Sequence, residues 1–262
     1  VFNTPAPTAV DQEYCISEAK TIGDLVATGT DVKWYESAIA TIELDATTLL
    51  ETGSYFATQT IDGCESTTRT QIEVTVFNTP APKADDQEYC ISEAKTIGDL
   101  VATGTDVKWY ESTTSTDVLD ATELLETRSY FASQTVDGCE STTRIEIEVT
   151  VFDTPAPTAA DQEFCISEAK TIGDLVVTGT DVKWYESANS TDVLGATTLL
   201  ETGSYFATQT VDGCESTTRT EIEVTIFNTP APTADDQEYC ISEAKTIGDL
   251  VATGTDVKWY ES

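Results

Sequence analysis

Cysteines are the residues of this chain whose type and spacing are suited to covalent chemistry, because the sequence contains seven of them and no histidine. They occupy two recurring positions: Cys15, Cys90, Cys165 and Cys240 at the first, and Cys64, Cys139 and Cys214 at the second. The chain has no C-x-x-C motif, the close spacing typical of structural zinc sites. The pattern therefore predicts a disulfide framework, which implies an oxidising, extracellular or periplasmic setting.

Two simple rules can pair these cysteines. Pairing across repeats joins each second-position cysteine to the next first-position one, as in Cys64–Cys90. Pairing within a repeat leaves Cys240 with its partner outside this sequence and gives Cys15–Cys64, Cys90–Cys139 and Cys165–Cys214. A disulfide needs Cα atoms within about 7 Å, and a whole strand and a proline connector separate Cys64 from Cys90. We therefore expect one intradomain disulfide in each repeat.

The elements that position the cysteines recur every 75 residues, the spacing of Trp34, Trp109, Trp184 and Trp259. A fixed period of this length indicates tandem domains. We place the repeats at 1–78, 79–153, 154–228 and 229–262, the last being only the N-terminal part of a repeat. Units this small bury a limited core and usually need additional stabilisation, which the cysteines would supply.

Within each repeat, short segments in which apolar and polar residues alternate predict strands. The tryptophan segment 31–35 places Trp34 on one face, and we expect all four tryptophans to anchor cores. Segment 69–76 turns Ile72, Val74 and Val76 inward, and Asp62-Gly63 favours a tight hairpin turn. Segment 20–26 suits either a strand or a helical turn. The sequence therefore predicts an all-β fold of tandem sandwich domains.

Proline connectors separate the predicted domains, as in residues 79–82 (Thr-Pro-Ala-Pro). Two prolines in four residues fix the backbone φ angle and favour an extended, stiff segment. We therefore expect an elongated array rather than loosely tethered domains.

The composition excludes several functions. Lys and Arg total 13 against 47 Asp and Glu, giving a net charge of −34, which argues against partners such as nucleic acid or anionic membrane surfaces. No apolar run approaches the ~20 residues that span a bilayer, so we expect no membrane insertion by this segment. Without histidine, a Ser-His-Asp or Cys-His site cannot form, and we expect no enzyme activity.

Acidic pairs just past the connectors raise one metal hypothesis. Asp85-Asp86 and Asp235-Asp236 could bridge adjacent domains through calcium. However, the first acid is Val10 in the first repeat and Ala160 in the third. We therefore expect no cofactor, with calcium at the domain junctions as the alternative.

Three motifs recur together: Lys33-Trp34-Tyr35, residues 53–60 (GSYFATQT), and Gly63-Cys64-Glu65-Ser66. In this combination the chain resembles the Ig-like repeat domains of very large Bacteroidota surface proteins associated with type IX secretion, adhesins of gliding bacteria among them. The resemblance implies an extracellular, cell-surface stalk or adhesin of Ig-like domains, with Cys15 and Cys64 as the disulfide. It implies no particular ligand.

The sequence thus favours a structural and adhesive role, as a stiff stalk or filament of a bacterial surface adhesin. Expected partners are other repeats of the same chain, surface glycans or identical chains in a filament. The alternative is a multivalent carbohydrate-binding array. In that case the segment 38–43, where the repeats differ most, would contact sugars, and Tyr35 could stack on them.

Overall fold

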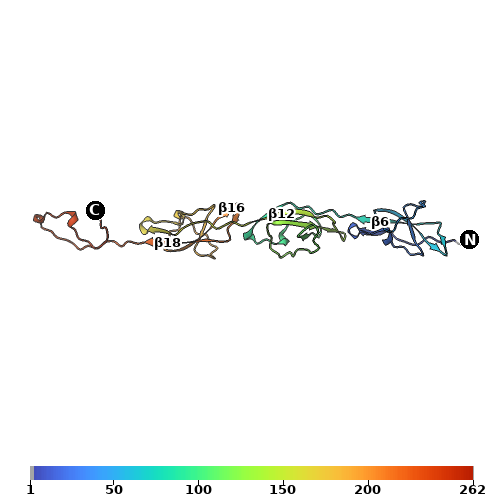
Figure 1. Cartoon of the computed structure of the whole chain (residues 1–262). Coiled ribbons are helices and arrows are strands. Elements are labelled where there is room, and N and C mark those ends of the chain that lie inside the picture. The colour runs from blue at the N-terminus through green and yellow to red at the C-terminus, as the bar shows by residue number, and fades with distance from the viewer. Residues whose placement is uncertain (1–2, 262) are drawn as a thin grey trace. The chain divides into compact units, whose positions relative to one another are not determined.

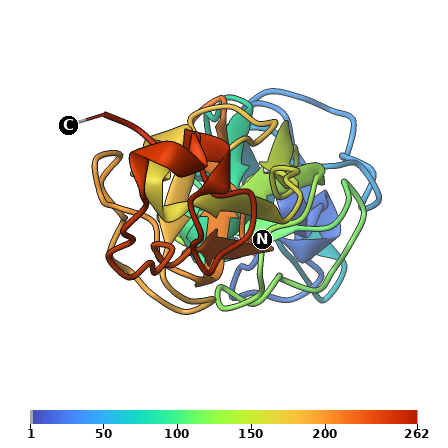
Figure 2. The ribbon, with the colours of Figure 1, turned by 90° about the vertical axis from the view of Figure 1, so that its left-hand side faces the viewer.

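The computed structural model describes residues 3–261; Val1, Phe2 and Ser262 lie outside the described residues. The chain divides into two compact units, Val1–Phe152 and Asp153–Ser262. The first unit holds repeats 1 and 2, and the second holds repeat 3 and residues 229–262. Strands and single 3-10 turns are the regular elements of the described chain (Figures 1 and 2).

Each complete repeat forms one four-stranded sheet. In repeat 1 its order is β1-β6-β3-β2, where β1 is Gln12–Cys15, β6 Thr70–Phe77, β3 Gly53–Thr58 and β2 Lys33–Tyr35. β1 pairs with β6 in parallel, and the other neighbours are antiparallel. The order β2-β3-β6 is that of the C, F and G strands of an immunoglobulin-type sandwich.

Repeats 2 and 3 reproduce this sheet strand for strand. The strands of repeat 2 are β7 (Gln87–Cys90), β8 (Lys108–Tyr110), β9 (Arg128–Ser133) and β12 (Ile145–Phe152). Those of repeat 3 are β13 (Gln162–Cys165), β14 (Lys183–Tyr185), β15 (Gly203–Thr208) and β18 (Thr220–Phe227). The predicted period of 75 residues is therefore a structural period as well.

The layer that faces each sheet is irregular. In repeat 1 it is held by the isolated bridges Thr8–Thr28 and Thr21–Leu49 and by the 3-10 turns η1 (Ile16–Glu18) and η2 (Ile22–Asp24). The ambiguous segment 20–26 is thus a single helical turn. The equivalents of η1 are η3 (Ile91–Glu93), η5 (Ile166–Glu168) and η7 (Ile241–Glu243), and those of η2 are η4 (Ile97–Asp99), η6 (Ile172–Asp174) and η8 (Ile247–Asp249).

The core of each repeat lies between these two layers. In repeat 1, Ile22 and Leu50 of the irregular layer pack against Trp34, Ile72 and Val74 of the sheet. The alternation predicted for 69–76 is therefore confirmed, because Ile72 and Val74 are buried while Glu73 is exposed. The all-β class of tandem Ig-like sandwiches is likewise confirmed, with the disulfides as the exception described below.

The four predicted core tryptophans have different surroundings. Trp34, Trp109 and Trp184 are buried, whereas Trp259 is 40% exposed. The structure assigns no strand to the described residues 229–261. In repeat 1, β3 and β6 supply the residues that bury Trp34, and no such strands lie beside Trp259 among the described residues. For Trp259 the prediction of a core anchor is therefore wrong.

A short hairpin projects from each sheet between its third and last strands. In repeat 1 it pairs β4 (Thr60–Ile61) with β5 (Cys64–Glu65). The predicted tight turn is present, since Asp62 and Gly63 both have positive φ, 49° and 77°, as a type I′ turn requires. The equivalent hairpins are β10–β11 (Thr135–Val136 with Cys139–Glu140) and β16–β17 (Thr210–Val211 with Cys214–Glu215).

Candidate functional site: a disulfide between repeats

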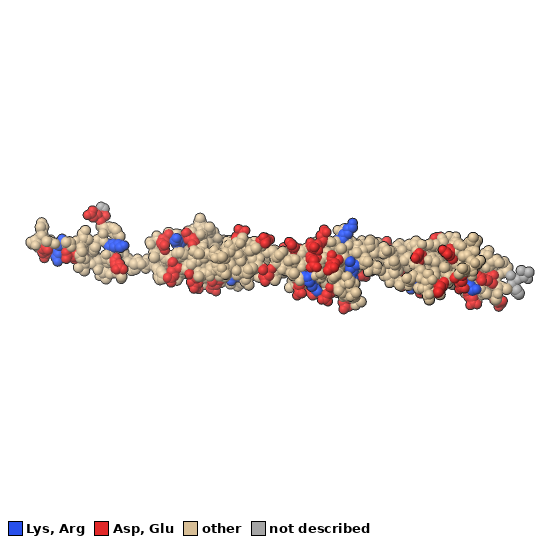
Figure 3. Space-filling model, turned by 45° about the horizontal axis from the view of Figure 1, so that its top comes forward, with Lys and Arg blue, Asp and Glu red and all other residues tan. Residues whose placement is uncertain are grey.

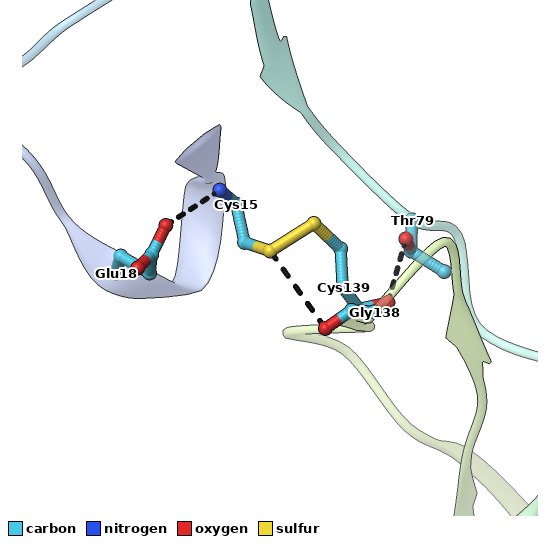
Figure 4. The surroundings of a disulfide bond; sticks show 5 residues. All are labelled: Cys15, Glu18, Thr79, Gly138 and Cys139. Carbon is cyan, nitrogen blue, oxygen red and sulfur yellow. Dashed lines mark hydrogen bonds between the residues drawn. A yellow bond between two sulfur atoms is a disulfide. The ribbon is translucent and has the colours of Figure 1, made fainter. Parts of the chain in front are cut away.

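A disulfide joins repeat 1 to repeat 2 inside the first unit. Cys15, at the end of β1, is bonded to Cys139, at the tip of the β10–β11 hairpin, with Cα atoms 5.3 Å apart and 124 residues between them in sequence (Figure 4). Turn η1, directly after Cys15, lies against β11. The bond is therefore a covalent link between two domains and not a brace within one.

All three predicted disulfides are consequently wrong. Cys15 and Cys139 bond to each other, which excludes Cys15–Cys64 and Cys90–Cys139. Cys165 is free, which excludes Cys165–Cys214. Cys90 and Cys214 are disulfide-bonded as well, while Cys64, Cys165 and Cys240 are free and exposed.

The physical reason is the parallel pairing of the first and last strands. Cys15 stands opposite Phe77, at the end of β6, whereas Cys64 lies in the hairpin that precedes β6. The eight residues of β6 span roughly 25 Å at ~3.3 Å per residue. The two cysteines of one repeat therefore lie at opposite ends of the domain, too far apart for a disulfide.

The backbone around Cys15 is fixed by a cap on the turn that follows it. The amide N–H of Cys15 donates to Oε2 of Glu18 at 2.8 Å (Figure 4). Ala19 ends the turn in the left-handed region, with φ of 48°. The motif Cys-Ile-Ser-Glu thus holds Cys15 at the point where the strand becomes a turn. The sequence signal for this turn is a glutamate three residues after the residue that caps it.

The hairpin tip that carries Cys139 is anchored to the proline connector. The hydroxyl of Thr79, a buried residue, donates to the carbonyl oxygen of Cys139 at 2.9 Å (Figure 4). Nε2 of Gln134 donates to the carbonyl of Pro80 at 2.8 Å. Because proline has no N–H, its carbonyl is the backbone group through which it can be held. Thr79 and Gln134 are site residues that the sequence analysis did not single out.

Sγ of Cys15 also lies 3.9 Å from the carbonyl oxygen of Gly138. A disulfide sulfur has no proton to donate, so this is a close packing contact. Gly138 has a φ of 82°, a conformation that glycine adopts without strain. The glycine therefore turns the chain so that Cys139 faces the preceding repeat.

A charged network next to the cysteine holds the hairpin against the sheet. Glu140 accepts hydrogen bonds from the hydroxyl groups of Ser133 and Tyr110 at 2.6 and 2.7 Å and from Nζ of Lys108 at 2.9 Å. Donation by Ser133 and by Lys108 lowers the pKa of Glu140 to about 2. The carboxylate therefore stays ionised and fixes β11 in place at neutral pH.

In the three complete repeats, the tyrosine that follows the core tryptophan is buried and its ring is covered by an arginine. The guanidinium of Arg144 lies 3.4 Å from the ring centre of Tyr110 and donates to the carbonyl groups of Ser112 and Ser115. Arg69 covers Tyr35 in the same way, at 3.8 Å, and Tyr35 is buried. Tyr35 is therefore not available to stack on a sugar, although Ile39 and Ile42 of the variable segment are exposed.

One acidic side chain just past the connector of each complete repeat bonds to the sheet of its own repeat. Oδ1 of Asp86 accepts the amide N–H of Glu148 at 2.8 Å, and Asp11 and Asp161 bond Glu73 and Glu223 in the same way. Among the residues that the structure describes, no group of three or more acids or cysteines is placed to hold a metal ion. Figure 3 shows acidic side chains spread over the visible face of each unit.

No helix in the described range 3–261 has the length and apolar character needed to cross a bilayer. The chain matches no family model and no curated protein.

The chain is similar to several solved structures of tandem domains. A mutated three-Ig fragment of titin is 9% identical, with 86% of this chain and 98% of that chain covered and a TM-score of 0.28. Immunoglobulin domains 1–5 of Sidekick-1 are 12% identical, with 86% and 58% covered and a TM-score of 0.21. Extracellular domains 3–5 of Drosophila OTK are 11% identical, with 85% and 95% covered and a TM-score of 0.23. These scores are low, and the fold assignment rests on the strand order of the chain itself.

Proposed function

We propose that this chain is a structural region of an extracellular surface protein that transmits tension, a stalk of Ig-like repeats tied together by disulfides. The observation that carries the proposal is the Cys15–Cys139 bond between repeats 1 and 2. Disulfides persist in oxidising compartments, which supports an extracellular location. The bacterial surface, type IX secretion and adhesion rest on the sequence resemblance, with the stalk presenting an adhesive region.

The position of the bond gives it a mechanical role. Tension that enters at one end of the chain reaches Cys15 and passes through the disulfide to Cys139. The intervening residues form a closed loop, which cannot lengthen while the bond is intact. Extended at ~3.3 to 3.6 Å per residue, a loop of this size would add roughly 400 Å. The disulfide therefore limits how far the repeats can be stretched when a domain unfolds.

Single-molecule stretching of the full chain tests this proposal. We expect the fully stretched oxidised chain to be shorter than the reduced chain by at least roughly 400 Å. The variant with Cys15→Ser and Cys90→Ser, which lacks both bonded first-strand cysteines, should reach the reduced length without reductant. The control variant Cys64→Ser changes a free thiol and should behave like the parent. Equal lengths before and after reduction would refute the proposal.

The carbohydrate-binding alternative gains no support from the site, because Arg69 covers the ring of Tyr35. Other repeats of the same chain are partners in the proposed stalk. Surface glycans remain a separate hypothesis that a glycan-binding assay on the chain would address.

A further inference from the structure

Repeats 1 and 2 meet at two pairs of facing residues. At the exit of repeat 1, Cys15 stands opposite Phe77 in the parallel pairing of β1 with β6. At the entrance of repeat 2, the hydroxyl of Thr79 donates to the carbonyl oxygen of Cys139 at 2.9 Å. We call these the exit pair and the entrance pair. The entrance bond recurs in repeats 1 and 3, so each pair is a feature of its own repeat.

Two short covalent links join the exit pair to the entrance pair. The disulfide connects Cys15 to Cys139, with Cα atoms 5.3 Å apart (Figure 4). The backbone connects Phe77 to Thr79 through one exposed residue, Asn78, and this link spans at most roughly 7 Å. The two links are therefore similar in length, and together with the two pairs they close a small ring.

The prolines that follow Asn78 lie within repeat 2 and not between the repeats. Nε2 of Gln134 donates to the carbonyl of Pro80 at 2.8 Å, and Pro82 is buried. The residue that lies outside both pairs is therefore Asn78 and not a proline. The backbone dihedral angles at such a residue can turn, unless a second link prevents it.

The disulfide is that second link. Neighbouring strands lie about 4.8 Å apart, so a bend of about 20° in the plane of the two links would require their lengths to differ by roughly 1.7 Å. A disulfide keeps its Cα atoms within about 4.4–6.8 Å of each other, which leaves little room for larger bends. Rotation of one repeat against the other would likewise separate the residues of the exit pair or of the entrance pair.

We propose that this ring is a rigid joint whose stiffness depends on the disulfide. When oxidised it fixes the orientation of repeat 2 relative to repeat 1, and when reduced it becomes a hinge at Asn78. The inference rests on the proposed function, because the bond that limits stretching would also limit bending. Reduction transfers two electrons and two protons from a dithiol such as dithiothreitol, which closes to a cyclic disulfide while Cys15 and Cys139 become thiols.

Time-resolved energy transfer between two dyes on the full chain tests the proposal. The dyes are attached through azide-bearing residues that replace Ile39 and Thr114, equivalent exposed positions of repeats 1 and 2. We expect a narrow distance distribution in the oxidised parent. Reduction or Cys15→Ser should at least roughly double its width, because the backbone through Asn78 is then the one link between the repeats. Cys64→Ser changes a free thiol and should keep the parent width.

Lengthening the backbone link provides a second arm that keeps the disulfide. Insertion of Gly-Ser-Gly after Asn78 makes the two links unequal, so the distribution should widen as it does in Cys15→Ser. Pro80→Ala, at an exposed position, should leave the width unchanged, because Gln134 bonds the carbonyl group, which alanine retains. Tryptophan fluorescence shows that the repeats of each variant are folded.

Three results would overturn the proposal. The first is a wide distribution in the oxidised parent. The second is the parent width in folded Cys15→Ser, which would mean that the contact of η1 with β11 holds the repeats without the bond. The third is the parent width in the insertion variant. If any of these occurs while the oxidised chain still stretches less than the reduced chain, the rigid joint fails and the proposed function stands. Equal stretched lengths would refute both.

Discussion

Cys15 stands directly opposite Phe77 in the parallel pairing of β1 with β6. Phe77 is the last residue of β6, after which the chain passes through the proline connector into repeat 2. The same register recurs in repeat 2, where Cys90 is opposite Phe152. The first-strand cysteine therefore lies at the exit of its domain. In repeat 2, Thr79 holds the hairpin with Cys139 at the entrance.

Removal of the inter-repeat bond should lower stability. We expect Cys15→Ser to reduce the free energy of unfolding of the linked repeats by about 2–5 kcal/mol, because the bond closes a long loop in the unfolded chain. Urea unfolding followed by tryptophan fluorescence measures the change. Cys64→Ser, which alters a free thiol, should leave the midpoint unchanged. Equal losses for the two variants would show that the Cys15–Cys139 bond does not stabilise the repeats.

The fold was predictable from the sequence because its signals are local and repeated. The period of 75 residues, the alternation around Trp34 and the Asp62-Gly63 turn each specify an element without reference to distant residues. The burial of Trp34 and the turn geometry follow from these patterns. A repeated pattern also shows where the cysteines recur, which is why a disulfide framework was a sound prediction.

The pairing of the cysteines was not predictable from the same signals. Alternation identifies strands, but it does not say that β1 pairs in parallel with β6 and so carries Cys15 to the exit of the domain. The spacing of 124 residues between Cys15 and Cys139 is present in the sequence, yet nothing local ranks it above shorter spacings. Thr79 and Gln134 escaped notice for the same reason, because their hydrogen bonds join residues far apart in sequence.

The Thr79 hydroxyl should protect the disulfide. We expect Thr79→Val to cost about 1 kcal/mol, because it removes a hydrogen bond from a buried carbonyl, and to speed reduction of Cys15–Cys139 by dithiothreitol. Timed alkylation with mass mapping of the two cysteines measures that rate. Thr142→Val, at an exposed position on the same hairpin connection, is the matched control. An unchanged reduction rate in Thr79→Val would mean that the hydroxyl does not hold the hairpin tip.

Acid should loosen the hairpin through Glu140. Its pKa in the folded protein is about 2, below the ordinary value near ~4.3. A lowered folded pKa gives stability that is present above the unfolded pKa and is lost as pH falls toward 2. We therefore expect Glu140→Gln to cost about 1–3 kcal/mol at neutral pH and to reduce the loss of stability between about pH 4.5 and 2.

Unfolding titrations at several pH values measure this dependence. Glu146→Gln, on the exposed side of β12, is the control and should keep the parent pH profile. If Glu140→Gln and the parent lose stability equally over that range, the network around Glu140 is not the source of the acid sensitivity.

Calcium should have no effect on stability, because Asp86, one acid of the pair past the connector, already accepts the amide N–H of Glu148 in the sheet. We expect Asp86→Ala to cost about 1 kcal/mol by leaving the amide of Glu148 without its acceptor, and Asp85→Ala, at an exposed position, to cost nothing measurable. Melting curves with calcium chloride and with a chelator should coincide for the parent and for both variants. A calcium-dependent rise in melting temperature that Asp85→Ala abolishes would support a metal at the junction instead.

The Cys15–Cys139 bond has one more consequence, for a chain exposed to proteases outside a cell. A single cleavage of any peptide bond between these two cysteines leaves both fragments attached through sulfur. Exposed loops such as the variable segment around Ile39 are the usual sites of such nicks. Cutting one loop would therefore not sever the molecule, and whatever the far end carries would stay tethered.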